Sequence, residues 1–239
     1  FFAWWATLAP LHRDEAGWHL TWPGSRLDQH RAQDPGEVAL LVGMVYGVSF
    51  DGFLSTGLGQ AALTRFAFLG DLGAFIIVLL LGFALFLAVF WTCLRWLVQV
   101  ARTLTPPAEL ARRFAVSLLP IAAAYHLAHN VPYLLARLPE ISQAINDPLG
   151  LGWHLLGAWS LPAIAWGEGT AKVVLALQML TIVTGHVLAV TAAHGAAYRA
   201  FPSRLQALKS ELPWTAVMVA YTMVGLYLVS GAGLTGGLG

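Results

Sequence analysis

The stretch from Leu72 to Leu94 reads LGAFIIVLLLGFALFLAVFWTCL and contains no charged residue. A helix of this length, at 1.5 Å per residue, is long enough to cross a hydrocarbon core of about 30 Å. In lipid, only helices and closed barrels satisfy all of their backbone hydrogen bonds. The apolar run is continuous and does not alternate with polar residues, as the strands of a membrane barrel do. This stretch therefore predicts a transmembrane helix.

The composition of the whole chain agrees with this interpretation. The chain has 239 residues, of which 58% are hydrophobic and 10% are charged, and its mean hydropathy is +0.68. Soluble domains carry about 25% charged residues, so a soluble enzyme and a disordered chain are excluded. The net charge of +1 provides no basic field for a nucleic acid. The single cysteine, Cys93, excludes an internal disulfide and a cysteine-based zinc site.

Four other apolar stretches resemble the first one. Together they predict an all-α, polytopic transmembrane bundle that forms a single domain with about five spans. The predicted spans are residues 38–58, 72–94, 114–136, 173–198 and 214–230. Residues 1–9 have the composition of the end of a helix already under way, which predicts an upstream helix. The glycine-rich residues 231–239 are expected to form a flexible tail.

The distribution of basic residues gives this topology an orientation. Five spans assign the loops alternately to two sides, and ten of the 13 lysines and arginines fall on one side. The other side holds Arg65, Arg137 and Lys172. Cytoplasmic loops carry an excess of basic residues, so the side with ten is predicted to be cytoplasmic. The C-terminus is then expected outside.

The longest outer segment covers residues 137–170. Asp147 and Pro148 are favourable residues for the N-cap and first position of a short helix, which would continue through the apolar residues 149–156. Such a helix is too short to span a bilayer. We expect it at the outer interface, either as a structural cap on the bundle or as a lid over a site.

Ionisable side chains within spans are rare and are candidates for function. Asp51 lies 14 residues after Glu37, and His126 lies 13 residues after Arg113. His186 lies 13 residues before Arg199. All three are then about 20 Å from the cytoplasmic ends of their helices. The spacing predicts one layer of ionisable groups contributed by three helices.

Neutral imidazoles combined with a carboxylate are suitable ligands for a divalent ion of the zinc or iron type. The predicted ligands are Asp51, His126, His129 and His186, since His129 shares a helix face with His126. An open coordination position would turn a bound water into a nucleophile. Residues flanking the histidines that could orient the ligands are Tyr125, Asn130 and Tyr133.

Three other interpretations of the same layer stay open. Haem b could be held by two histidines, with His126 or His129 facing His186. The chain would then be a membrane subunit of a larger, electron-transferring complex. The polar layer could also belong to a transporter, with His194 continuing the path toward the cytoplasm. Finally, the polar side chains could only join helices by hydrogen bonds.

Four segments together resemble a family of polytopic bacterial membrane proteins described as fenitrothion-hydrolase-like. The segments are SFDGF at 49–53, LPIAAAYHLAHN at 119–130, NDPLGLGW at 146–153 and GHVLAVTAAH at 185–194. The resemblance implies a bacterial inner-membrane protein that hydrolyses an organophosphate ester, and it adds Asp147 and His194 as positions of interest. His154 departs from the pattern, in which an aspartate follows the tryptophan.

The leading hypothesis is therefore a helical bundle in a bacterial inner membrane with a metal site that opens outward. A metal-bound water would attack a phosphoester, and residues 147–154, including Asp147 and His154, would form the lid. The expected partners are the lipid bilayer and other membrane subunits. The alternative is a subunit without catalytic activity or with bound haem, in which His126, His129, His186 and His194 are the possible ligands.

Overall fold

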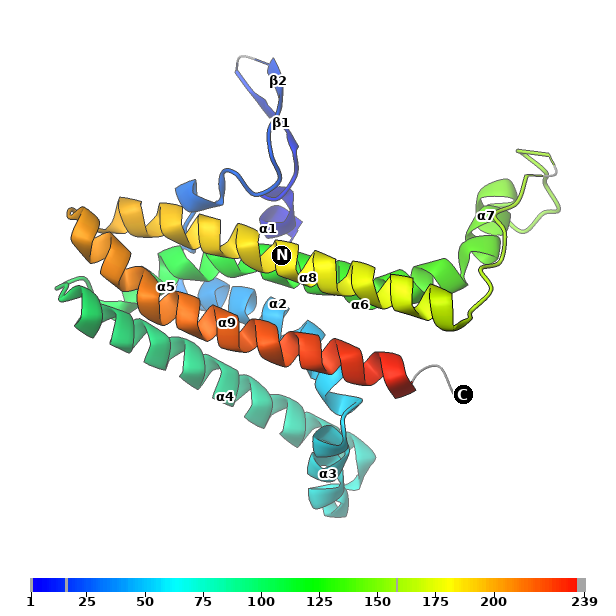
Figure 1. Ribbon diagram of the computed structural model, residues 1–239. Helices are drawn as coiled ribbons and strands as arrows, with labels where there is room; N and C mark the ends of the chain where they lie inside the picture. Colours follow the sequence, from blue (N-terminus) through cyan, green and yellow to red (C-terminus); the bar gives the residue numbers. More distant parts are fainter. Residues whose placement is uncertain (1, 16, 158, 236–239) are drawn as a thin grey trace.

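Five long helices form an elongated bundle in the computed structural model, which describes residues 2–15, 17–157 and 159–235 (Figure 1). Their bounds are Pro35–Leu54 for α2, Gly70–Ala101 for α4, Leu119–Ala136 for α6, Glu168–Ala200 for α8 and Arg204–Thr235 for α9. The predicted all-α bundle is confirmed at this level. The helices α3 (Gly57–Arg65) and α7 (Leu138–Asn146) lie at one end of the bundle, and the α8–α9 connection lies at the other (Figure 1).

Four segments in the described part of the chain are long and apolar enough to cross a membrane. They are Pro35–Leu54, Ala67–Ala101, Pro107–Ala136 and Glu168–Ala200. The second includes η2 (Ala67–Leu69) and has a mean hydropathy of 3.0, the highest of the four. The third joins α5 (Pro107–Phe114), η3 (Ala115–Leu118) and α6 without a loop. These helices make the chain a membrane protein by length and composition.

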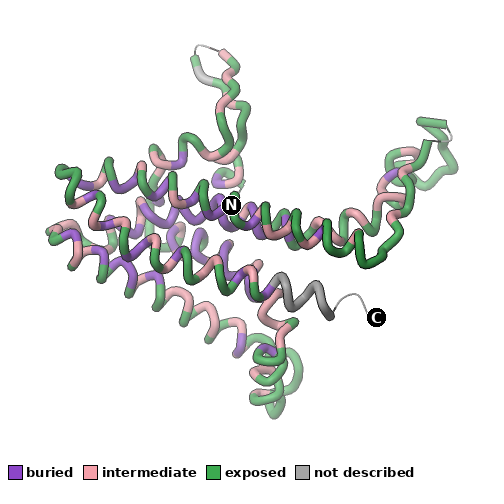
Figure 2. The backbone as a smooth tube through the Cα atoms, viewed as in Figure 1, coloured by how far each residue is buried: buried purple, intermediate pink, exposed green. Residues whose placement is uncertain are grey.

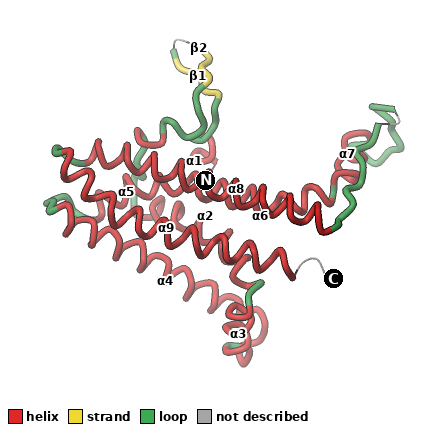
Figure 3. Tube along the Cα trace, in the orientation of Figure 1, coloured by secondary structure: helices red, strands yellow, loops and turns green. Residues whose placement is uncertain are grey.

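The N-terminal region contains the only strands among the described residues. A short helix, α1 (Phe2–Ala6), precedes an antiparallel hairpin of β1 (Leu11–Asp14) and β2 (Gly17–Leu20), which stands away from the bundle (Figure 3). The sequence interpretation placed no strand here. The segment returns to the bundle at η1 (Leu27–Gln29), where the Asp28 carboxylate accepts a 2.8 Å hydrogen bond from Arg199 Nε on α8.

Two predicted boundaries differ from those of the structure. Residues 38–58 were predicted as one span, but α2 ends at Leu54, because the Thr56 hydroxyl accepts a hydrogen bond from the Gly59 N–H and starts a new helix. Residues 231–239 were predicted as a tail, but α9 continues to Thr235. The rest of that prediction, residues 236–239, lies outside the described residues.

The short helix that was predicted between the third and fourth spans lies before Asp147 and not after it. Helix α7 begins after Arg137, with Pro139 in its first turn, where a missing N–H costs nothing. The predicted helix over residues 147–156 is wrong, because Gly150 and Gly152 adopt positive φ angles of 66° and 78°. These left-handed conformations produce turns in place of a helix.

The core of the bundle depends on close contact between α6 and α8. Buried segments are concentrated where these helices meet α2 and α5, whereas α3 and α7 are largely exposed (Figure 2). Gly185 on α8 packs directly on α6: a Cβ at this position would overlap that of Ala124 and lie 2.9 Å from the carbonyl oxygen of Pro120. A glycine is therefore required at this crossing, as small residues are at other membrane helix interfaces.

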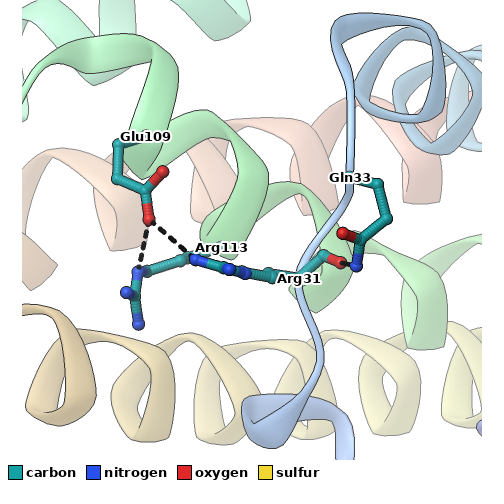
Figure 4. A network of polar contacts seen from close by, with 4 residues as sticks. All are labelled: Arg31, Gln33, Glu109 and Arg113. Carbon is teal, nitrogen blue, oxygen red and sulfur yellow. Dashed lines mark hydrogen bonds and ion pairs between the residues drawn. The ribbon is translucent and has the colours of Figure 1, made fainter.

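One ion network fastens the N-terminal segment to α5. Glu109 Oε1 lies 3.5 Å from Arg31 Nη1 and 3.3 Å from Arg113 Nε, so one carboxylate serves two arginines (Figure 4). Beside it, the backbone N–H of Ala32 donates a 2.8 Å hydrogen bond to the carbonyl oxygen of Arg112. These contacts hold residues 31–33 against the end of the bundle where the basic residues are concentrated.

Replacing Gly185 tests the helix contact. We expect Gly185→Ala to lower the free energy of unfolding by about 1–3 kcal/mol, because the new methyl group has no space beside Ala124. Thermal unfolding in detergent should then show a melting temperature lowered by roughly 2–4 °C per kcal/mol. Gly169 lies on the same helix with open space around it, so Gly169→Ala is the matched control and should not lower the melting temperature. Equal behaviour of the two variants would contradict the packing argument.

Candidate functional site

The four predicted metal ligands do not converge in the structure. His186 is buried, whereas Asp51, His126 and His129 are exposed on the surface of the bundle. Within residues 2–15, 17–157 and 159–235, no three His, Cys, Asp or Glu side chains are grouped so that they could hold a metal ion. The geometry gives this ligand set no support, and a metal at these residues stays a prediction.

Most of the polar residues predicted on α6 lie on its exposed face. The His126 ring lies 6.1 Å from that of Trp5 in α1, and the Asn130 amide donates a hydrogen bond to the carbonyl oxygen of His126. Tyr133 is also exposed, and the Arg137 guanidinium lies 5.5 Å from its ring centre. Of the residues predicted to orient the ligands, only Tyr125 points into the bundle, where it is 3% exposed.

His194 has a partner of its own near the basic end of the bundle. Its Nδ1 atom lies 2.7 Å from Glu211 Oε1, and its ring contacts that of Tyr198. His186 instead faces Tyr125 and Tyr221, with ring centres 6.1 and 5.8 Å away. The pairing of His186 with His126 or His129 that haem would need receives no support from these contacts.

The structure brings together a different set of polar residues, one from each of four helices. Ser49 on α2, Tyr125 on α6, His186 on α8 and Tyr221 on α9 form this polar cluster. The rings of Tyr125 and Tyr221 are 5.8 Å apart, and the hydroxyl groups of Ser49 and Tyr221 are hydrogen-bonded. Tyr221 was not recognised from the sequence, where a tyrosine in an apolar span carries no distinguishing signal.

Two polar atoms of this cluster lack partners. The His186 Nδ1–H donates a 2.9 Å hydrogen bond to the carbonyl oxygen of Ile182, which leaves Nε2 of the neutral ring as an acceptor. Among the described residues, neither His186 Nε2 nor the Tyr125 hydroxyl has a hydrogen-bond partner. The Tyr125 hydroxyl packs against Gly225 of α9, where a Cβ would overlap it. Buried polar atoms are normally paired, so an unpaired hydroxyl and an unpaired ring nitrogen in one cluster are unusual and require an explanation.

An apolar cavity of about 510 Å³ lies on the other side of Tyr221. Its walls come mainly from α2, α4 and α9, and its lining contains no Lys, Arg, Asp, Glu or His. Ser49 and Tyr221 of the polar cluster belong to the lining, together with Tyr46 and Trp214. The Tyr46 hydroxyl already has a hydrogen-bond partner, because it donates a 2.8 Å hydrogen bond to the carbonyl oxygen of Leu79. The cavity and the polar cluster therefore share one wall.

The loop between α7 and α8 is folded around two side chains. The Asp147 carboxylate accepts hydrogen bonds from the N–H groups of Leu151 and Gly152, at 2.9 and 2.7 Å. The Asn146 side chain accepts one from Leu156 N–H and donates one to the carbonyl oxygen of Gly157. Asp147 thus has a structural role in the loop.

His154 belongs to the same loop and is exposed. Its Nδ1 atom lies 3.0 Å from the carbonyl oxygen of Gly152, two residues earlier. Neither His154 nor Asp147 is among the residues that line the apolar cavity. The lid predicted for this segment therefore has no contact with the cavity in this structure.

The pKa of Asp147 lies below its ordinary value. Desolvation raises this pKa, but the hydrogen bonds from the backbone N–H groups of Gly152 and Leu151 outweigh it and stabilise the carboxylate. A lowered carboxyl pKa means that the loop is stabilised fully above the ordinary value of 3.8. This stabilisation is lost as the pH falls below 3.8 through the lower pKa of the folded loop.

Comparisons with protein families, with curated proteins and with solved structures found no match to this chain. The resemblance to fenitrothion-hydrolase-like proteins is therefore a hypothesis that rests only on the four sequence segments given above.

Asp147→Asn tests the folding of the loop. The amide side chain has one acceptor oxygen where the carboxylate has two, so one of the two backbone N–H groups loses its partner. We expect hydrogen exchange at Leu151 or Gly152 to become about tenfold faster at neutral pH. The exposed Glu140 pairs with Arg137 outside this loop, so Glu140→Gln is the control and should leave both exchange rates unchanged. Unchanged exchange in Asp147→Asn would contradict the structural role of the Asp147 carboxylate in the loop.

Proposed function

We propose that this chain is a multi-pass membrane protein that binds a membrane-soluble, apolar molecule in the cavity between α2, α4 and α9. The observation that carries this proposal is the cavity itself. Its volume of about 510 Å³ lies within the usual range of small-molecule sites, roughly 300–1,000 Å³. Its lining is aromatic and aliphatic, with a few hydroxyl groups on one wall. Such a site favours a largely hydrocarbon ligand that reaches it from the bilayer.

The absence of charge from the lining supports the choice of ligand class. A charged ligand would be buried without a partner of opposite sign, which is strongly unfavourable in a low-dielectric interior. An apolar ligand gains favourable free energy for each part of its surface that the cavity covers. The residues that line the cavity lie together in the structure, whereas the ligands predicted for a metal-dependent hydrolase do not. Elemental analysis of the purified protein would test the hydrolase hypothesis, and its absorbance spectrum would test for haem.

We also propose that α9 is the fifth span and that the C-terminus lies outside a bacterial inner membrane. The short connection between Ala200 and Arg204 makes α9 antiparallel to α8. Arg199, Arg204 and Lys209 then lie at the same end as α5, whereas the last residues of α9 lie at the opposite end (Figure 1). The positive-inside rule supports this orientation.

The exposed face of α6 supports the proposal of further membrane subunits. His126, His129, Asn130 and Tyr133 form a polar stripe on this face of the helix. Polar side chains within a span rarely face lipid, because they find no partners there. A helix of another subunit that covers the stripe would provide those partners.

Filling the cavity should abolish binding. Ala220 lines the cavity on α9, so we expect Ala220→Phe to occupy part of it and exclude the ligand. Trp214 also lines the cavity, and its fluorescence can report an alkane that carries a quenching bromine, such as 1-bromododecane. In nanodiscs, the wild-type protein should be quenched at lower mole fractions of this alkane than a Trp214→Phe variant, and Ala220→Phe should remove the difference.

Val219 is the matched control position. Both residues are exposed on the same helix, but Val219 does not line the cavity, whereas Ala220 does. Val219→Phe should therefore bind 1-bromododecane like the wild-type protein. If Ala220→Phe and Val219→Phe show the same quenching, the cavity is not the binding site.

A reporter fusion tests the topology. Alkaline phosphatase joined after Gly239 should be active in a bacterial host, because the enzyme requires export and α9 places the C-terminus outside. The same reporter inserted between Ala200 and Arg204 should be inactive, because this connection lies on the side with the basic residues. The opposite pattern would invert the proposed orientation, and activity at both positions would remove α9 as a span.

A further inference from the structure

We propose that the polar cluster of Ser49, Tyr125, His186 and Tyr221 is a head-group subsite for the ligand of the apolar cavity. The ligand class that it fits is a neutral amphiphile with a hydroxyl group, such as a long-chain alcohol or a hydroquinone. This inference rests on the proposed function, since the cavity supplies the space for the hydrocarbon part.

Two buried polar side chains of the cluster, His186 and Tyr125, each have an atom without a partner among the described residues. His186 is 6% exposed and Tyr125 is 3% exposed, so both side chains are more than nine-tenths buried. Within the described part of the chain, His186 Nε2 and the Tyr125 hydroxyl have no hydrogen-bond partner. The ring of Tyr221 contacts both of their rings. The two residues come from α6 and α8, and their ring centres are 6.1 Å apart.

The two unpartnered atoms differ in hydrogen-bonding capacity. Because His186 Nδ1–H is bound to the carbonyl oxygen of Ile182, Nε2 can only accept a hydrogen bond while the ring is neutral. The Tyr125 hydroxyl can donate one. A ligand hydroxyl can both donate and accept, so it matches the hydrogen-bonding capacity of the two atoms. An alkane satisfies neither of them.

The cavity and the polar cluster offer no lysine or arginine to an anionic head group. The cavity lining contains no Lys or Arg, and neither does the polar cluster. A carboxylate or phosphate head group would therefore be buried without a cation. While His186 is neutral, a fatty acid anion and a phospholipid head group are disfavoured on this ground, and a neutral head group is favoured.

Tyr221 provides the connection between cavity and subsite. Its side chain lines the cavity, and its ring separates the cavity from Tyr125 and His186. Its hydroxyl is held by Ser49 and by the carbonyl oxygen of Val45, at 3.3 Å from the latter. A ligand hydroxyl that enters from the cavity meets Ser49 and Tyr221 first. Tyr125 and His186 do not themselves line the cavity, so access to the unpartnered pair requires a movement of the Tyr221 ring.

The test compares three brominated probes with the same chain length in the nanodisc quenching assay: 12-bromo-1-dodecanol, 1-bromododecane and 12-bromododecanoate. Concentrations are expressed as mole fractions in the bilayer, which removes differences in partitioning. In the wild-type protein, we expect the alcohol to quench Trp214 at a mole fraction about tenfold lower than the alkane, and the carboxylate to bind most weakly.

Tyr125→Phe and His186→Phe should each reduce the preference for the alcohol to about twofold or less, while binding of the alkane is retained. Tyr46→Phe is the matched control: its hydroxyl also belongs to the cavity lining but is already bound to Leu79. This variant should keep the full preference. Retained alkane binding shows that the Tyr125 and His186 variants are folded around an intact cavity.

The outcomes separate this inference from the proposed function. Equal binding of alcohol and alkane by the wild-type protein would overturn the head-group subsite and leave the cavity as a binding site. A preference that survives in both Tyr125→Phe and His186→Phe would also overturn it. If no probe quenches Trp214, the proposed function itself fails.

Discussion

The contact between α6 and α8 at Gly185 determines the geometry of everything around it. A helix surface normally keeps its neighbour at a distance set by side chains, but a glycine allows the backbone of α8 to reach Pro120 and Ala124. The next residue is His186, and the residue after Ala124 is Tyr125, so the same contact places these two polar side chains against each other. The site is thus a direct consequence of backbone proximity. Gly225 repeats the principle on α9, where the missing side chain makes room for the Tyr125 hydroxyl.

The helical bundle could be predicted because it depends on the one-dimensional distribution of apolar residues. The uncharged run from Leu72 to Leu94 can satisfy its backbone in lipid only as a helix, and the structure places it within α4. The ends of the helices depend on local bonds that hydropathy does not record. The Thr56 cap that ends the first span and the positive φ of Gly150 are examples. The hairpin at residues 11–20 is too short and too polar for its pairing to be visible in the sequence.

The predicted site illustrates a different limit. Counting residues from the charged ends of the helices estimates height along the bundle, but it does not determine how each helix is rotated about its axis. Asp51, His126 and His186 were assigned to one layer by this count, yet only His186 faces the interior. The residues that do meet it, Tyr125, Tyr221 and Ser49, are ordinary members of apolar spans. Only Tyr125 was predicted from the sequence, as a residue that could orient the ligands, and the packing adds that its hydroxyl and His186 Nε2 have no partner among the described residues.

The use of four separate helices for one polar cluster also has a consequence for biogenesis. Ser49 is synthesised early, whereas Tyr221 lies on the last helix and leaves the ribosome about 170 residues later. Until α9 packs against α2, the hydroxyl of Ser49 bonds only to the carbonyl oxygen of Val45 on its own helix, and the Tyr221 ring between cavity and cluster is not in place. Packing of α9 completes the bundle and one wall of the cavity together, so a protein that is truncated before α9 retains the four span-length segments but lacks that wall.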